Sequence, residues 1–226
     1  MSRYRKELKI KINYIDKIAI SSRISSVLQR DPYTGSKGYY IVRSIYFDDI
    51  NNSALHEKLM GVKDREKYRI RLYDYSTATI RLEKKVKNNG FGYKETALLS
   101  LAECQALLAG EYDFLKTRSE AVCRSLYAKV ATGLFKPKTI VEYQREAYIW
   151  EPGRIRITID SFPKTGMGST AFLDFSTILV STGEPGFSIL EIKYDHYLPK
   201  HICNLVQLQN RDITSVSKYV LCRKYG

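Results

Sequence analysis

Three Glu-x-Lys pairs recur far apart along the chain, at Glu7-Leu8-Lys9, Glu83-Lys84-Lys85 and Glu191-Ile192-Lys193. Residues two positions apart in a β-strand share one face of the sheet, so each pair would place a carboxylate beside an ammonium group. A single pair of this kind would be a surface salt bridge that contributes little. Carboxylates that lie among phosphate-binding cations are, however, where a divalent metal docks. The three pairs together therefore favour a shared anion and metal site.

Basic and apolar residues alternate strictly in several other segments. The clearest is Lys67–Tyr73, in which Lys67, Arg69 and Arg71 would share one strand face, opposite Ile70 and Leu72. In an ordinary antiparallel sheet the apolar face forms the core and the charges face water. In the alternative arrangement the charged faces line a tunnel, which must be wet and must hold an anion because buried unpaired cations are too costly.

The composition limits the function classes. The 226 residues carry a formal net charge of +13, which implies an anionic partner such as nucleic acid, an acidic membrane or a phosphate-rich small molecule. The basic residues are spread along the chain, which argues against a flexible nucleic-acid-binding arm. Four cysteines without metal-site spacing predict free thiols. Neither a signal segment nor an apolar run long enough to span a membrane is present, which predicts a cytoplasmic protein that can still contact a membrane surface peripherally.

The hydrophobic periodicity predicts an α+β domain covering residues 1–226. Strands are expected at 7–12, 39–48, 66–73, 79–87, 91–99, 138–148, 154–161 and 187–194, with a weaker candidate at 171–175. Helices are expected at 15–28, 51–60, 100–109, 119–131, 201–208 and 215–222, the first capped by Asn13 and the third by a capping box at Ser100. About eight antiparallel strands suffice to close a barrel with the helices packed outside.

The order of short motifs resembles the polyphosphate polymerase domain of the vacuolar transporter chaperone (VTC) family, within the CYTH-like triphosphate tunnel metalloenzyme superfamily. The similar segments are Tyr4-Arg5-Lys6-Glu7-Leu8-Lys9, Ser44-Ile45-Tyr46-Phe47-Asp48, Tyr68-Arg69-Ile70-Arg71, Leu82-Glu83-Lys84-Lys85, Lys94-Glu95, Tyr143-Gln144-Arg145, Arg156-Ile157-Thr158-Ile159-Asp160, Leu190-Glu191-Ile192-Lys193 and Ser217-Lys218-Tyr219. Each motif is weak alone, but their order and spacing together are fairly specific.

The resemblance implies a closed basic tunnel in which the γ-phosphoryl group of ATP is transferred to a growing polyphosphate chain. Catalytic roles are implied for Arg69, Arg71, Lys85, Arg145 and Arg156, and phosphate binding for Lys9, Lys94, Lys193 and Lys218. Mn²⁺ or Mg²⁺ is implied at Glu191, with Glu7 and Glu83 as further metal ligands. The implied partners are ATP, polyphosphate and inorganic phosphate rather than nucleic acid.

The sequence departs from the family pattern at two positions. Arg5 stands where the first strand commonly carries its first glutamate, and Ser215 stands where a second lysine often precedes Ser217-Lys218-Tyr219. Fewer metal-binding carboxylates disfavour hydrolysis of short triphosphates and favour polymer synthesis. A triphosphatase or nucleotidyl cyclase of the same fold, and a non-catalytic module that binds polyphosphate or nucleic acid, stay open as alternatives.

Overall fold

The computed structural model describes residues 6–89, 91–132, 134–183, 185–208 and 213–224. The strands are β1 (Lys6–Ile12), β2 (Gln29–Arg30), β3 (Tyr40–Asp48), β4 (Arg65–Tyr73), β5 (Ser76–Asn88), β6 (Phe91–Leu99), β7 (Lys136–Trp150), β8 (Ile155–Thr165), β9 (Val180–Ser181) and β10 (Ser188–Tyr194). The helices are α1 (Tyr14–Ser25), α2 (Ser53–Leu59), α3 (Leu101–Ala109), α4 (Ala121–Val130), α5 (Lys200–Val206) and α6 (Lys218–Arg223), with short 3₁₀ turns at Pro32–Thr34 and Asp113–Lys116.

Side-chain caps fix the starts of α1 and α3, as the sequence predicts. The Asn13 side chain accepts a hydrogen bond from the Asp16 amide, and the Asp16 carboxylate accepts one from the Asn13 amide. Ser100 and Glu103 form the same reciprocal capping box at α3. Each cap satisfies amide donors that have no partner within the first helical turn. The expected strand at 171–175 is wrong, because that segment forms turns.

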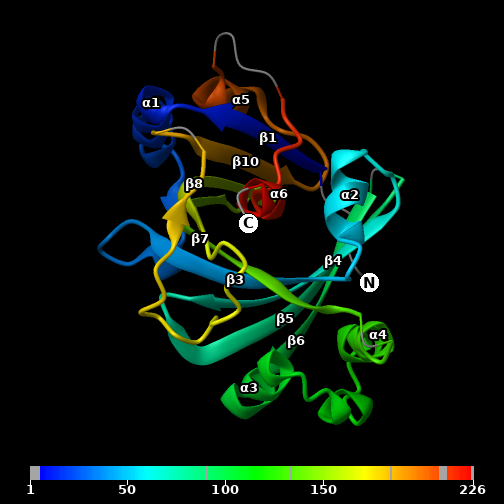
Figure 1. The fold of residues 1–226 in the computed structure, drawn as a ribbon. Coiled ribbons are helices and arrows are strands. Elements are labelled where there is room, and N and C mark those ends of the chain that lie inside the picture. The colour runs from blue at the N-terminus through cyan, green and yellow to red at the C-terminus, as the bar shows by residue number, and fades with distance from the viewer. Residues whose placement is uncertain (1–5, 90, 133, 184, 209–212, 225–226) are drawn as a thin grey trace.

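One antiparallel sheet contains all of these strands. Eight of them follow the order β1-β10-β8-β7-β3-β4-β5-β6, while β2 pairs with β7 and β9 pairs with β8. Figure 1 shows the sheet curled around a central opening, with α6 inside the curl. Register shifts between Tyr46 and Phe47, between Arg71 and Tyr73, and between Glu142 and Gln144 interrupt the ladders. Irregularities of this kind bend strands and increase their twist, which helps the sheet to curl.

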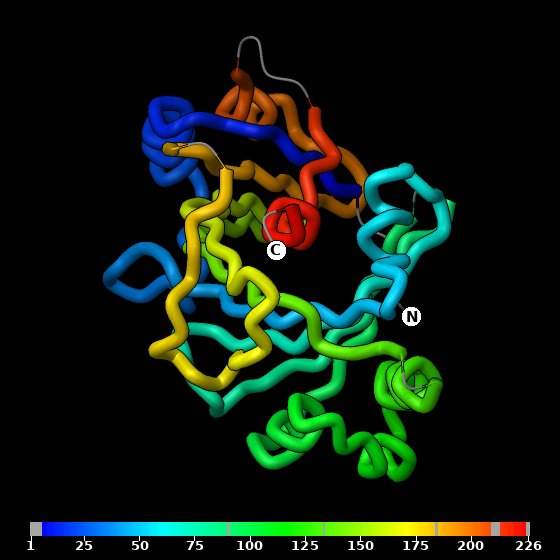
Figure 2. Tube along the Cα trace, in the orientation of Figure 1, coloured from blue at the N-terminus to red at the C-terminus, as the bar shows by residue number. Residues whose placement is uncertain are grey.

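The closed barrel expected from the sequence is wrong, because the described strands form an open half-barrel. β1 and β6 end the strand order and do not pair with each other. The free edge of β1 is taken instead by the C-terminal segment: Ile10 forms an antiparallel bridge with Ile213, and the Thr214 amide donates to the Lys9 carbonyl at 2.7 Å. Figure 2 shows this segment running beside β1. A strand that closed the barrel would need that edge.

The apolar strand faces point outward and pack under the helices. Ile70, Leu72 and Leu82 belong to one core with Leu107 of α3 and Leu126 of α4. A second core joins apolar side chains of β8 and β10 to α1 and α5, namely Ile157, Ile159, Leu190, Ile192, Ile20, Ile24, Ile202 and Val206. Of the two arrangements expected for the alternating strands, the structure has the second: the helices cover the apolar face of the sheet, and the charged face lines the inside of the curl. The four cysteines are free, as expected.

Candidate functional site: a basic pocket inside the curled sheet

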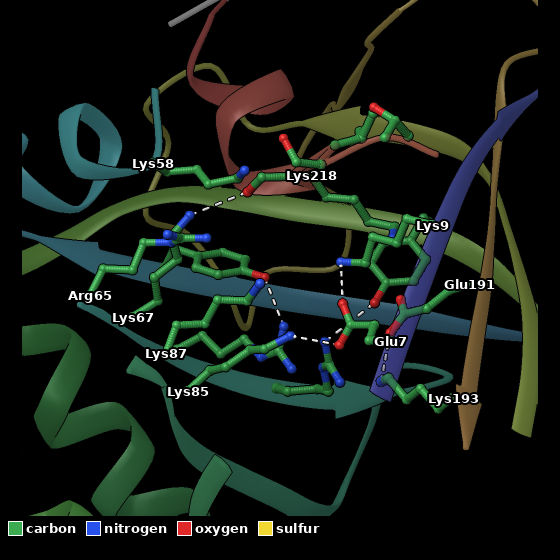
Figure 3. Close-up of a pocket in the computed structure, with 18 of the residues that line it drawn as sticks. Glu7, Lys9, Lys58, Arg65, Lys67, Lys85, Lys87, Glu191, Lys193 and Lys218 are labelled. Carbon is green, nitrogen blue, oxygen red and sulfur yellow. Dashed lines mark hydrogen bonds and ion pairs between the residues drawn. The ribbon is translucent and has the colours of Figure 1, made fainter. Parts of the chain in front are cut away.

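The charged strand faces enclose a pocket of about 240 Å³ on the concave side of the sheet. Its lining comes from β1, β3, β4, β5, β7, β10, the end of α2 and the segment that leads into α6. Nine of the twelve residues to which the sequence assigns a role in the site line it: Glu7, Lys9, Arg69, Arg71, Lys85, Arg145, Glu191, Lys193 and Lys218. Distant parts of the chain thus converge on one cavity, part of which Figure 3 shows.

Two carboxylates reach the pocket at the end formed by β1 and β10. Glu7 forms ion pairs with Lys9 at 2.8 Å and with Lys85 at 3.1 Å, and Glu191 forms one with Lys193 at 2.6 Å. Burial and the neighbouring Glu191 both raise the pKa of Glu7, but Lys85, Lys9 and Lys193 outweigh them and lower it to about 2. Burial also opposes ionisation of Glu191, and again the surrounding cations hold its pKa well below the usual range. Both carboxylates are therefore ionised at neutral pH.

The Glu7–Lys85 ion pair spans the opening of the half-barrel. β1 lies at one end of the strand order, and β5 lies beside the last strand at the other end. The two sheet ends therefore meet through side chains at this point, where backbone hydrogen bonds do not join them. The hydrogen bond from Lys67 of β4 to Ser217 at 3.3 Å also crosses this opening, because Ser217 follows the segment that pairs with β1.

Two arginines on β4 line the pocket, and side chains of neighbouring strands hold their guanidinium groups in place. Arg69 donates to Glu83 at 2.7 Å from Nε and to the Tyr46 hydroxyl at 2.8 Å from Nη1. Arg71 has weaker partners, the Ser44 hydroxyl at 3.2 Å and the Tyr143 hydroxyl at 3.3 Å, while its Nη1 lies 3.7 Å from Glu83. A planar guanidinium fork with neutral and distant partners is well suited to binding phosphate oxygens.

Buried carboxylates beneath the lining fix the cations. Asp160 accepts from Arg145 at 2.6 and 2.7 Å, in a two-bond arrangement, and from Lys218 at 2.5 Å. Burial raises the pKa of Asp160, but Arg145 and Lys218 outweigh it and lower the pKa to about 2. The Lys218 ammonium also lies 4.7 Å from the Tyr143 ring centre. The next residue, Tyr219, donates to buried Asp48 at 2.6 Å and so anchors α6 to β3.

Acid is expected to weaken the fold through Asp160. The pKa of Asp160 is about 2 in the folded protein and 3.8 in the unfolded chain. Its contribution to the free energy of unfolding is therefore complete above pH 3.8 and is lost as the pH falls toward 2. Between about pH 6 and about pH 3 this group alone should cost about 1 kcal/mol of unfolding free energy. Urea unfolding at the two pH values measures the loss. Asp160→Asn should lack this part of the pH dependence, and identical pH dependence in the two proteins would contradict the prediction.

Three residues expected in the site lie outside the pocket lining. Glu83 is buried beneath it, with Oε2 bound to Arg69 and Oε1 bound to Lys94 at 2.6 Å. Lys94 is thereby directed to Glu83. Arg156 lies beyond the pocket, where it pairs with Asp31 at 2.6 Å and donates to Tyr40 at 3.0 Å. The alternation of side chains along a strand, here called strand parity, predicts which face of the sheet a side chain is on. It does not predict how far the pocket extends along that face, which is why these three residues were expected to line it.

Several lining residues were not assigned to the site from the sequence. Four are basic: Lys58, Arg65, Lys67 and Lys87. Tyr46, Tyr143 and the segment 213–217 also line the pocket, including Ser215 at the position where the family often has lysine. Strand parity could have found Arg65, Lys67 and Lys87, which share a face with Arg69 or with Lys85. Lys58 is on a short helix and gives no such signal. Arg5 lies outside the described residues.

Comparison with known proteins identifies the family. A family model described as the VTC domain matches residues 4–225. The chain belongs to the VTC domain family. A search of curated protein sequences found no match to this VTC domain. No helix among its described residues is long and apolar enough to cross a membrane.

Solved structures resemble this VTC domain in fold. A candidate adenylyl cyclase from Hippeastrum, described as having a dominant triphosphatase activity, has a TM-score of 0.61 at 15% identity, over 98% of this chain and 95% of that one. A protein from Pyrococcus horikoshii has a TM-score of 0.52 at 13% identity, over 97% and 99%. A candidate adenylate cyclase from Bacillus halodurans has a TM-score of 0.51 at 14% identity, over 90% and 86%. At these identities the likeness shows a shared fold.

Proposed function

We propose that this VTC domain is a metal-dependent polyphosphate polymerase that transfers the γ-phosphoryl group of ATP to the end of a polyphosphate chain. One observation carries the proposal: the guanidinium groups of Arg69, Arg71 and Arg145 converge with ionised Glu7 and Glu191 on one open pocket. Phosphoryl transfer requires mainly positioning and positive charge where the transition state spreads its negative charge. The pocket offers both.

The reaction needs little from the protein besides this arrangement. A terminal oxygen of the acceptor chain forms a new P–O bond to the γ-phosphorus of ATP. The bond between that phosphorus and the oxygen that links the β- and γ-phosphates breaks, and ADP leaves with this oxygen. The attacking oxygen is already ionised, so the step requires no general base. We propose that Arg71 binds equatorial oxygens of the transferred group through its fork. Arg145, whose Nε and Nη2 already donate to Asp160, contributes its positive charge and its remaining N–H donors. Lys9, Lys85 and Lys193 act as point charges near the attacking and leaving oxygens.

The donor set of the pocket fits a Mn²⁺ or Mg²⁺ ion that shares its ligands with phosphate. The charge of Glu191 raises the pKa of Glu7, and both side chains line the same cavity, which places two mutually repelling carboxylates together there. The described residues contain no cluster of three or more acidic, His or Cys side chains that could hold a metal. Mg²⁺ is commonly held by one or two carboxylates together with substrate phosphates. Bound there, the ion would neutralise negative charge on the substrate phosphates.

Metal binding is therefore expected to depend on phosphate and on Glu191. Electron paramagnetic resonance of Mn²⁺ should show weak binding to the protein alone and at least about tenfold tighter binding with a non-hydrolysable ATP analogue. Glu191→Gln should remove that enhancement, because the amide lacks the charge. Glu146→Gln is the control, since Glu146 pairs with Lys17 at 2.9 Å and does not line the pocket. Equal Mn²⁺ affinity in both variants would exclude Glu191 as a ligand.

Product analysis tests the proposal. Phosphorus NMR of protein with ATP and Mn²⁺ should show interior phosphates of a growing chain, with ADP formed in equal amount to the phosphate incorporated. Orthophosphate without polymer would instead favour a triphosphatase, the activity for which the Hippeastrum neighbour is described. Cyclic nucleotide would indicate a cyclase. Polyphosphate binding without ATP turnover would indicate a non-catalytic module.

A further inference from the structure

One hydroxyl group of the pocket lies beside a lysine in a strongly cationic environment. Ser217, the residue before α6, accepts a hydrogen bond from Lys67 at 3.3 Å, and both side chains line the pocket. Figure 3 shows Lys67 on the same side of the pocket as Lys58 and Arg65. A serine becomes a nucleophile when a neighbouring base takes its proton, and a lysine can be that base when its amine is neutral.

The surroundings of Lys67 favour the neutral amine. Burial lowers its pKa, nearby cations lower it further, and the result is about 7. These cations come from α2, β4 and β5, and they are Lys58, Arg65 and Lys85. Asp48 of β3 favours the ammonium, but it accepts a hydrogen bond from the Tyr219 hydroxyl of α6, whose ring centre lies 5.1 Å from the Lys67 nitrogen. About half of the Lys67 side chains are therefore neutral at pH 7.

A second serine–lysine contact lies outside the pocket and has a different environment. Ser125 of α4 accepts a hydrogen bond from Lys84 at 3.1 Å, a shorter distance than that between Lys67 and Ser217. Lys84 also forms an ion pair with Glu66 at 3.0 Å. Burial lowers the pKa of Lys84, but Glu66 and Tyr68 outweigh burial and raise it above the usual range. Lys84 therefore stays charged at neutral pH and cannot accept a proton from Ser125.

We propose that the protein phosphorylates itself on Ser217, with ATP in the pocket as the phosphoryl donor and Lys67 as the general base. The inference rests on the proposed function in one respect, because it takes the binding of ATP in this pocket from that proposal. An acceptor phosphate is already ionised and needs no base, whereas a serine hydroxyl must lose its proton. The Ser217–Lys67 contact supplies the base that only the second reaction requires.

The step balances within the pocket. The Ser217 oxygen forms a new P–O bond to the γ-phosphorus of ATP, and its proton moves to the Lys67 nitrogen. The bond between that phosphorus and the oxygen that links the β- and γ-phosphates breaks, and ADP leaves with this oxygen and the bonding electron pair. The ammonium formed at Lys67 then lies beside the phosphoserine, and Lys58 and Arg65 add further positive charge that stabilises the new dianion.

Mass spectrometry of the protein after incubation with ATP and Mn²⁺ tests the inference. We expect the mass of one added phosphoryl group, and peptide mapping should place it on Ser217. Ser217→Ala should lose this modification and keep its melting temperature within about 2 °C, because the Ser217 side chain makes no capping hydrogen bond to α6. Ser125→Ala is the matched control and should be phosphorylated on Ser217 to the same extent as the wild type.

Lys67→Arg separates the base from its positive charge. Arginine keeps a cation in the pocket, but it does not lose its proton at neutral pH. The rate of phosphorylation of Ser217 should therefore fall at least about a hundredfold, while the affinity for ATP should change by less than about threefold. Lys84→Arg makes the same change in the serine–lysine pair outside the pocket and should alter neither quantity. A purely structural role of Lys67 would not separate the rate from the affinity.

The pH dependence gives a second readout of the same base. At ATP concentrations far below saturation the rate reports the free protein, so it should rise through about pH 7 and level off as Lys67 loses its proton. At saturating ATP the midpoint should lie higher, because the charge of bound phosphates raises the pKa of Lys67. The profile of Lys67→Arg contains only the ionisation of ATP itself and serves as the baseline.

The inference is overturned if no phosphoryl group is incorporated, if it lies on a residue other than Ser217, or if Lys67→Arg keeps the wild-type rate. Product analysis of the same samples separates it from the proposed function. Polymer formation without phosphoserine at position 217 at any time point would refute self-phosphorylation alone. Phosphoserine at position 217 without polymer would refute the polymerase alone.

Discussion

Replacing Arg71 by lysine is expected to lower the rate of polyphosphate synthesis about a hundredfold, because a point charge cannot replace the two-bond fork on the transferred phosphoryl group. The substitution keeps the positive charge beside Glu83 and loses hydrogen bonds from the guanidinium to neutral hydroxyl groups, among them those of Ser44 and Tyr143. The melting temperature should therefore decrease by no more than about 2–4 °C. The effect is measured as the initial rate of the ADP release that accompanies polymer formation.

Arg118→Lys provides the matched control for this substitution. Arg118 lies outside the sheet, where it pairs with Glu103 at 2.6 Å and with Glu120 at 2.5 Å. It should retain the wild-type rate. If Arg71→Lys kept the wild-type rate as well, the role proposed for the β4 fork would be wrong.

Replacing Glu83 by glutamine is expected to cause the largest loss of stability, about 3–5 kcal/mol, because removing one partner of a buried ion pair leaves uncompensated charge. The Glu83 side chain is 1% exposed and compensates Arg69, Arg71 and Lys94. Burial raises the pKa of Glu83, but these three cations hold it well below the usual range. Urea unfolding at neutral pH, with the slope compared between variants, gives the free-energy change.

Glu66→Gln makes the same chemical change at a carboxylate that water can reach. Glu66 also has two cationic partners, Lys84 and Lys129, each at 3.0 Å, but its side chain is 29% exposed. Its loss should cost less than about 1 kcal/mol. Equal destabilisation by the two substitutions would show that burial of Glu83 does not determine its contribution.

Much of the local structure follows from the sequence because its causes are local. The caps at Asn13 and Ser100 depend on residues three positions apart, and both form as expected. The alternation in Lys67–Tyr73 places Ile70 and Leu72 under the helices and Arg69 and Arg71 in the pocket. The parity of a strand is fixed by its backbone geometry, so it can be predicted once the strand is identified.

The features that could not be predicted depend on contacts between distant segments. β1 and β6 do not pair, and Ile213 instead bridges Ile10 at the edge of β1; no periodic pattern encodes either feature. Arg156 has the expected parity but is drawn to Asp31, a loop residue far away in the sequence. Lys58 enters the pocket only because α2 lies over β4.

The position of bound tripolyphosphate is the most direct test of the phosphate-binding and metal-binding roles proposed for Arg71, Arg145 and Glu191. A crystal structure with tripolyphosphate and Mn²⁺ would locate the phosphates by difference density and the metal by anomalous scattering. We expect phosphate oxygens within hydrogen-bond distance of Arg71 and Arg145, with Mn²⁺ beside Glu191. An empty pocket, with tripolyphosphate bound only on the outer surface of the sheet or helices, would contradict it.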